Sequence, residues 1–206
     1  MPPDARHRQP GPRQQGGKVY CAWQSLADPG LEIVSLQRNG RRLVAEGKAL
    51  RILSGLTSAI TWRIECDPDW RTRALTVWPT GVSEPLLAAE CNGRGLWTVG
   101  RGHIRDRITG CVDLHLADGP FCHTLPIRRL GMNVLGQEVR VRVALADAVS
   151  GSLRPARHAY TLLAAAGTGH LFGFRDLDSG SECELLVDDF GLVQDQPGRF
   201  RMIWCA

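Results

Sequence analysis

The sequence predicts a mainly β protein with little helix, built as a single large curved antiparallel sheet that forms a barrel or half-barrel. Two observations support this fold class. Apolar and polar residues alternate with a period of two in many short segments, which places successive side chains on opposite faces of a strand. Residues that favour tight turns separate these segments at hairpin-like spacing.

Five segments show the clearest alternation: 60–66, 111–116, 138–145, 183–188 and 200–205. In the first, Trp62 and Ile64 share one face, which predicts that both are buried. In the last, Phe200, Met202 and Trp204 share one face, so Trp204 is also expected in the core. Each segment therefore reads as a half-buried strand.

Turn chemistry divides the chain into about ten to twelve short strands. The turn sites are Asp28-Pro29-Gly30, Asn39-Gly40, Asp67-Pro68-Asp69, Asn92-Gly93 and Asp118-Gly119. Helix signal is weak and is confined to Ala144–Ala148 and the alanines near Ala164. This order of elements favours one antiparallel sheet over a βαβ architecture.

One domain suits a chain of 206 residues, of which 43% are hydrophobic and 22% charged. Residues 1–17 are rich in Pro, Gln, Gly and Arg and offer almost nothing to bury, so they are expected to form a disordered tail. Residues 18–206 are expected to form a single β domain.

Composition also narrows the class of function. The net charge of +4 comes from 25 Lys+Arg against 21 Asp+Glu, and part of the excess lies in the first 18 residues, which disfavours a nucleic-acid partner. No integral membrane segment or secretory signal is evident, which predicts a cytoplasmic protein. Seven widely spaced cysteines favour reduced, buried thiols. The histidine spacing indicates neither a metal site nor a cofactor.

The segment Pro120–Leu130, PFCHTLPIRRL, resembles the signature TPFTNTLPIRRL of the bacterial putative glycolipid-binding family. Further features of that family follow in the same order over about 19–204, among them Trp23, Trp70-Arg71-Thr72-Arg73, Asn92-Gly93, Trp97 and Gly110-Cys111-Val112-Asp113. The resemblance implies a curved sheet similar to that of lipoprotein-carrier proteins, with a ligand cavity on its concave side. It also implies non-enzymatic binding of an amphiphilic ligand such as a glycolipid or other lipid.

The two adjacent arginines of the signature are the main candidate site residues. In an extended TLPIRRL segment, Arg128 and Arg129 point to opposite faces, and Pro126 indicates an edge, a bulge or a strand start. An inward arginine needs a carboxylate, and the candidates are Asp113, Glu32 and Asp188. One reading is a buried ion pair that stabilises the sheet, and the other is a head-group site; each arginine can serve one role.

The complete expected ligand-binding set is Arg128, Arg129, Thr124, His123, Asp113, Glu32, Trp70 and Trp97. The two tryptophans adjoin turns, so they either line a cavity mouth or belong to the core. An alternative function is an enzyme that acts on a small acidic substrate with Arg128 or Arg129 and Asp113 or His123. A third is an interaction protein whose sheet edge recruits a partner strand.

Overall fold

A computed structural model describes residues 17–53, 56–100, 102–117, 119–166 and 169–206. These residues form a mainly β protein, which confirms the predicted fold class. The predicted disordered tail lies outside the described residues, except for Gly17. Among the described residues, no helix has both the length and the apolar character needed to cross a membrane.

The described chain contains fifteen strands, two 3-10 helices and one α-helix. In chain order these are β1 (Val19–Ser25), β2 (Gly30–Asn39), β3 (Arg42–Leu53), β4 (Leu56–Cys66), β5 (Thr72–Pro79), β6 (Leu87–Cys91), β7 (Trp97–Val99), β8 (His103–Ile104), η1 (Asp106–Ile108), β9 (Asp113–Leu116), η2 (Phe121–His123), α1 (Thr124–Leu130), β10 (Glu138–Ala146), β11 (Leu153–Ala166), β12 (Gly169–Asp176), β13 (Glu182–Asp188), β14 (Val193–Gln196) and β15 (Phe200–Cys205).

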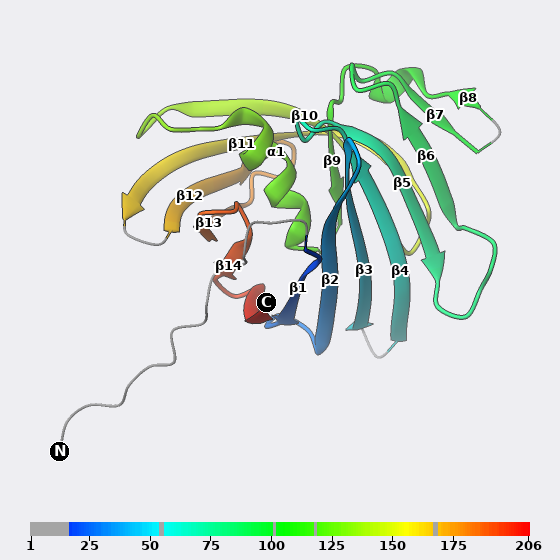
Figure 1. The fold of residues 1–206 in the computed structure, drawn as a ribbon, viewed down its shortest axis with the longest axis horizontal. Coiled ribbons are helices and arrows are strands. Elements are labelled where there is room, and N and C mark those ends of the chain that lie inside the picture. Colours follow the sequence, from blue (N-terminus) through cyan, green and yellow to red (C-terminus); the bar gives the residue numbers. More distant parts are fainter. Residues whose placement is uncertain (1–16, 54–55, 101, 118, 167–168) are drawn as a thin grey trace.

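All strands belong to one curved sheet in the order β8-β7-β6-β5-β4-β3-β2-β1-β15-β14-β13-β12-β11-β10-β9, and the sheet is not closed. The first strand therefore lies in the middle, where it joins the meander β2–β8 to the last strand and through it to β14–β10. Neighbours are antiparallel except for β9, which pairs in parallel with β10. The short helix α1 lies within the curve of the sheet (Figure 1).

The alternation predicted for β4 and β13 is confirmed by burial, whereas that of β10 holds only as far as Val143, because Ala144 is buried and Leu145 is half-buried. Trp62 and Ile64 are each 1% exposed, and Leu185 and Val187 are buried while Leu186 between them is exposed. The segment 111–116 departs from a half-buried strand, because Asp113 and its neighbour Leu114 are both buried. The segments η2 and α1 both lie against the edge strand β9.

The prediction that Trp204 lies in the core is wrong. A bulge in the pairing of β1 with β15 places Ala22 opposite Trp204 but Trp23 opposite Met202, so Ile203 is an extra residue. Because of the extra residue, the side chains after the bulge point to the opposite faces of the sheet from those that the alternation predicts. Trp204 therefore points outward and is 48% exposed.

The weak helix signals at Ala144–Ala148 and Ala164 are also wrong, because most of these alanines lie in β10 and β11. Strand pairing outweighs the helix propensity of alanine. Ala144 and Ala146 are fully buried in β10, between β9 and β11, where a small side chain permits close packing on both sides.

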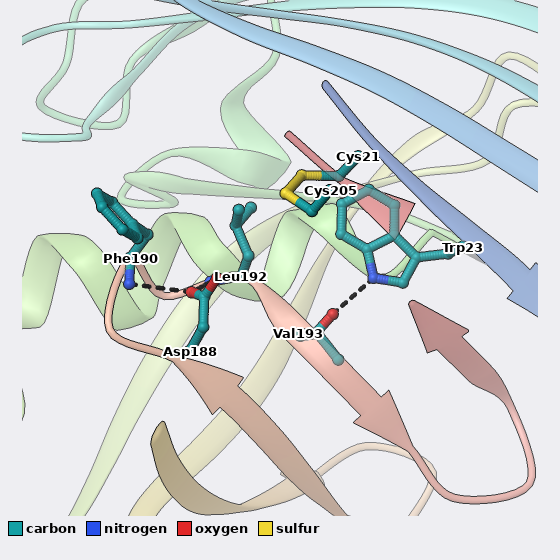
Figure 2. The surroundings of a disulfide bond; sticks show 7 residues. All are labelled: Cys21, Trp23, Asp188, Phe190, Leu192, Val193 and Cys205. Carbon is teal, nitrogen blue, oxygen red and sulfur yellow. Dashed lines mark hydrogen bonds between the residues drawn. A yellow bond between two sulfur atoms is a disulfide. The ribbon is translucent and has the colours of Figure 1, made fainter. Parts of the chain in front are cut away.

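The same inversion of phase turns Cys205 inward, where it forms a disulfide with Cys21 on β1 (Figure 2). The expectation that all seven cysteines are reduced is therefore wrong for this pair. Cys66, Cys91, Cys111 and Cys122 are free and buried, and Cys183 is free and half-buried. The alternation predicted for β15 placed Cys205 on the outer face, so sequence spacing concealed the pair.

Close packing on the inner side of the sheet requires a residue without a side chain at Gly47 on β3. A Cβ atom at this position would overlap the indole ring of Trp62, which is opposite it on β4. We expect Gly47→Ala to lower the free energy of unfolding by about 1–3 kcal/mol through overpacking. Gly173→Ala on β12 is the control, because its Cβ would meet only the Leu163 side chain at 3.4 Å or more. Equal stability of the two variants in urea titrations would contradict the packing described.

Candidate functional site

The signature segment is helical, so the prediction that TLPIRRL is extended is wrong. Residues Phe121–His123 form η2, and Thr124–Leu130 continue it as α1. The helix ends at Gly131, whose N–H donates to the Ile127 carbonyl at 3.2 Å. Pro126 is the third helical residue, where a missing N–H costs nothing because the first four N–H groups of a helix have no partner within it.

The helix divides its side chains between the two halves of the interior. Leu125 packs in the cluster that includes Trp62, and Ile127 packs in the cluster that includes Phe172. Arg128 and Arg129 lie in the last turn, where cations interact favourably with the helix dipole. Successive residues on a helix diverge by about 100°, so the two arginines face different surroundings, as expected, although for a different reason.

The half-buried Arg129 forms an ion pair with the buried Asp113 of β9. Its Nε donates to Asp113 Oδ1 at 2.7 Å and its Nη2 donates to Oδ2 at 2.6 Å, which is the bidentate arrangement of the strongest ion pairs. The Asp113 side chain is 1% exposed. Hydrogen bonding to Asp113 raises the pKa of Arg129. This pair ties α1 to the edge strand and uses both charges.

Arg128 is exposed and has different partners. Its guanidinium lies 5.4 Å from the centre of the Trp70 ring, and its Nη1 donates to the Asp189 carbonyl at 3.4 Å. Among the described residues, Trp70 is the one non-glycine residue with a positive φ, at 62°. The Asp67 carboxylate holds this turn, since its Oδ1 accepts the N–H of Arg71 at 3.0 Å. Such backbone strain is characteristic of functional sites.

A small pocket of about 130 Å³ lies beside Arg128. Its apolar lining comes from α1, β12 and β13, and its polar lining from His170 and the turn after β13. The lining residues are Ile127, Arg128, Gly131, Met132, His170, Phe172, Val187, Asp188, Asp189 and Gly191. Its lining residues therefore include one cation, two acidic residues and a histidine together with apolar side chains. We call it the Arg128 pocket.

The turn at the end of β13 fixes one wall of the Arg128 pocket. Asp188 Oδ1 accepts the N–H groups of Phe190 at 2.9 Å and Leu192 at 2.8 Å, while burial raises the pKa of Asp188. Gly191 allows Arg128 to approach, because a Cβ there would lie 2.8 Å from Arg128 Cδ. Figure 2 shows this turn beside the disulfide, with Leu192 between Asp188 and the sulfur atoms.

The central strand β1 also anchors this turn. The indole N–H of Trp23 donates to the Val193 carbonyl at 2.6 Å, as Figure 2 shows. Leu192 and the half-buried Phe190 pack in the same cluster as Trp23 and Cys21. The position of the pocket wall therefore depends on the junction between β1 and β15.

Glu32 forms a separate polar cluster on β2. Its carboxylate accepts from Arg51 Nη2 at 3.3 Å and from the Trp62 indole N–H at 3.1 Å. Glu32 is 1% exposed, and Phe121 of η2 stacks on Trp62 with ring centres 5.6 Å apart. Sequence reasoning missed Arg51, because one arginine in a long alternating strand carries no signal that it points inward.

His123 belongs to a buried aromatic cluster on the other side of η2. Its Nδ1 lies 3.0 Å from the Tyr160 hydroxyl, and its ring contacts those of His115 and Phe174 edge-on. Burial, followed by the nearby charges of His158 and Arg199, lowers the pKa of His123 to about 3. The imidazole is therefore neutral and engaged in packing near pH 7.

Two further predicted residues are buried. Thr124 is 0% exposed at the start of α1. Trp97 is also 0% exposed, and its indole N–H donates to the Cys111 carbonyl at 2.7 Å, which places it in the core and not at a cavity mouth. The structure thus brings Arg128 together with Trp70 and with the candidate carboxylate Asp188, and it pairs Arg129 with Asp113. The other predicted residues are distributed through the interior.

The concave side of the sheet is filled where a ligand cavity was expected. The segment η2–α1 occupies it, with its apolar side chains in both core clusters. A smaller space of about 40 Å³ lies near Arg51, against the turn at Asp147–Val149. Sequence reasoning did not find the helical plug, nor His170 and Asp189 beside Arg128, because these residues are distant in the chain from the signature.

The three neighbouring histidines make stability depend on pH. Burial lowers the pKa of His115, His123 and His158 below the ordinary 6.5. The unfolded chain then binds more protons than the folded chain below pH 6.5, so this stability is complete above that pH and is lost as the pH falls toward about 3. We expect His123→Phe to flatten the dependence in urea titrations at several pH values. An unchanged slope would contradict the buried, neutral state of His123.

The adjacent arginines are expected to differ in their contribution to stability. Arg129→Ala leaves the buried Asp113 carboxylate without its partner, which costs about 3 kcal/mol in the free energy of unfolding. Arg128→Ala is the matched control and is expected to cost less than about 1 kcal/mol, because that side chain is exposed. Chemical denaturation measures both, and equal losses would mean that the ion pair is not the structural contact described here.

Comparisons with known proteins agree with the signature. A family model described as "Putative glycolipid-binding" matches residues 20–202. The crystal structure of a DUF1089 family protein from Pseudomonas aeruginosa is similar over 96% of this chain and 99% of that one, with 29% identity and a TM-score of 0.64. No curated protein matches the chain. The family model matches most of the sequence, and the chain therefore belongs to the putative glycolipid-binding family.

Proposed function

We propose that the protein binds the polar head of an amphiphilic molecule, such as a glycolipid, in the Arg128 pocket and does not convert it. The observation that carries this proposal is that the two signature arginines have different surroundings. Arg129 is half-buried and neutralised by the buried Asp113, whereas Arg128 is exposed beside a pocket. Membership of the family supports a ligand of this class.

The chemistry of the Arg128 pocket favours a head group rich in hydroxyl groups. A sugar hydroxyl both donates and accepts, so it suits a site that holds the Arg128 guanidinium together with the carboxylates of Asp188 and Asp189. A phosphate would be repelled by those carboxylates. The Trp70 ring lies against the Arg128 guanidinium, with its centre 5.4 Å from it, and so orients this cation beside the pocket.

The size of the pocket sets how much of a ligand it holds. Its volume of about 130 Å³ is small beside the roughly 300–1,000 Å³ that encloses a complete small-molecule ligand. We infer that the pocket takes part of the head group. The apolar chain would then continue over Met132 toward Val134 and Leu135, which are 55% and 61% exposed in the loop after α1.

The contacts of the signature support binding rather than catalysis. Asp113 and Arg129, the pair named for an enzyme, satisfy each other. His123 is buried with a pKa of about 3, and burial raises the pKa of the Cys122 thiol to about 12. Catalysis near neutral pH needs groups that titrate there and reach the substrate. The cytoplasmic location and the lack of a nucleic-acid partner stay predictions from composition.

Calorimetric titration with octyl glucoside below its micelle concentration tests the proposal. We expect Arg128→Ala and Asp189→Ala each to weaken binding by about tenfold or more, since hydrogen bonds to charged groups contribute about 1.5–3 kcal/mol. Arg140→Ala is the control, because Arg140 is exposed on β10 and remote from the pocket.

Octyl phosphate serves as the comparison ligand and should bind more weakly than octyl glucoside. Three results would overturn the proposal: affinity for octyl glucoside that does not change in Arg128→Ala, a preference for octyl phosphate, or release of glucose from the ligand.

A further inference from the structure

The outer face of the sheet carries a group of exposed apolar side chains on four adjoining strands, β15, β1, β2 and β3. We call this group the outer patch. Its members, with their exposed fractions, are Tyr20 (42%), Leu31 (37%), Ile33 (47%), Leu50 (48%), Ile52 (42%) and Trp204 (48%). A contiguous apolar patch on a protein surface commonly marks an interaction site.

Strand register shows that the patch is continuous. Trp204 is opposite Ala22, Ala22 is opposite Ile33, and Ile33 is opposite Lys48 across three successive strand pairs. Adjacent strands lie about 4.8 Å apart, so side chains in such a row touch. In the next row, Leu31 is opposite Leu50. The outer patch therefore forms one surface.

The outer patch faces away from α1. Along β2, Leu31 and Ile33 are exposed, whereas Glu32 and Val34 between and after them are buried on the concave side. Alternate side chains of a strand lie on opposite faces of the sheet. A partner of the outer patch therefore makes no contact with the Arg128 pocket, and the inference does not rest on the proposed ligand.

The charge within the outer patch is positive. Lys48 lies in the row of Ile33 and Trp204. The acidic Glu46 lies in the row of Tyr20, but it is already paired with Lys18 and Arg63, so the cations on these rows outnumber it. Lys18 and Arg201 lie at the margin, beside Glu46 at 3.8 Å and Asp195 at 3.0 Å. An occupant of this surface must therefore accept both apolar side chains and a cation.

A second copy of the chain fits these demands poorly. A two-fold dimer through the outer patch would set each Lys48 ammonium against apolar side chains, against its own equivalent, or against a Glu46 carboxylate that Lys18 and Arg63 already neutralise. Burying an unpaired ammonium is costly. An anionic lipid surface offers an apolar layer for Ile33 and Leu50, and phosphate groups for Lys48, whose long side chain can reach them.

The aromatic residues agree with such a surface. Trp204 and Tyr20 border the outer patch on one side, where β15 and β1 meet. Trp and Tyr rings are enriched at the boundary between water and lipid, because one end of each is apolar and the other polar. We propose that the outer patch docks the protein reversibly on the surface of an anionic bilayer, with Ile33, Leu50 and Trp204 in the interfacial layer and Lys48 on lipid phosphates.

Vesicle co-sedimentation tests this docking. One set of vesicles contains phosphatidylcholine alone and the other contains added phosphatidylglycerol, and neither contains glycolipid. We expect the wild-type protein to bind the anionic vesicles and to be released by salt. Lys48→Ala should weaken this binding about fivefold, and Ile33→Glu or Leu50→Glu should abolish it.

Leu163→Glu is the matched control, because Leu163 is 45% exposed on β11, outside the outer patch. Thermal unfolding checks that each variant is folded. Arg128→Ala should bind vesicles like the wild type, which separates this inference from the proposed ligand site.

The inference is overturned if the wild type ignores both sets of vesicles, or if Leu163→Glu impairs binding as much as Leu50→Glu. It is also overturned if sedimentation of the protein alone shows a dimer that Leu50→Glu dissociates, because the outer patch would then bind a second copy.

Discussion

The bidentate ion pair between Arg129 and Asp113 is the contact on which the arrangement of the interior depends. It joins the only α-helix of the described chain to the parallel edge strand β9, inside a sheet that does not close on itself. The sheet alone would leave its concave side open to water. With the pair formed, η2 and α1 remain against that side, and the apolar side chains of the signature complete both core clusters.

The same pair determines which arginine faces solvent. Because adjacent residues on a helix diverge by about 100°, holding Arg129 on Asp113 directs Arg128 toward Trp70 and the turn after β13. Trp23 of the central strand holds this turn after β13 through its hydrogen bond to the Val193 carbonyl. The Arg128 pocket is thus positioned by the helix on one side and by the junction of the first and last strands on the other.

Sequence patterns predicted the fold class well, and for identifiable reasons. In β4 and β13 successive side chains alternate between the buried and the outer face of the sheet, so Trp62 and Leu185 could be placed inside from their spacing alone. The pattern failed at β15, because one extra residue at the bulge reverses the phase without any mark in the sequence, which misplaced Trp204 and concealed the disulfide of Cys205.

The site was less predictable than the fold. The TLPIRRL segment is compatible with both a strand and a helix, since Pro126 is tolerated in a first helical turn as well as at a sheet edge. Asp113 was correctly named as a carboxylate partner of the arginine pair, but only the helix shows that Arg129 is the residue it binds. His170 and Asp189 come beside Arg128 through tertiary packing, which leaves no local signal.

The two signature arginines have separate roles, Arg129 in the structure and, as proposed, Arg128 in ligand binding. The most direct test follows the Nε–Hε resonances of both arginines by NMR while octyl glucoside is added. We expect the Arg129 resonance to be protected from exchange by its bond to Asp113 and not to move, while the Arg128 resonance shifts until the site is saturated. A shift at Arg129 with none at Arg128 would contradict these separate roles.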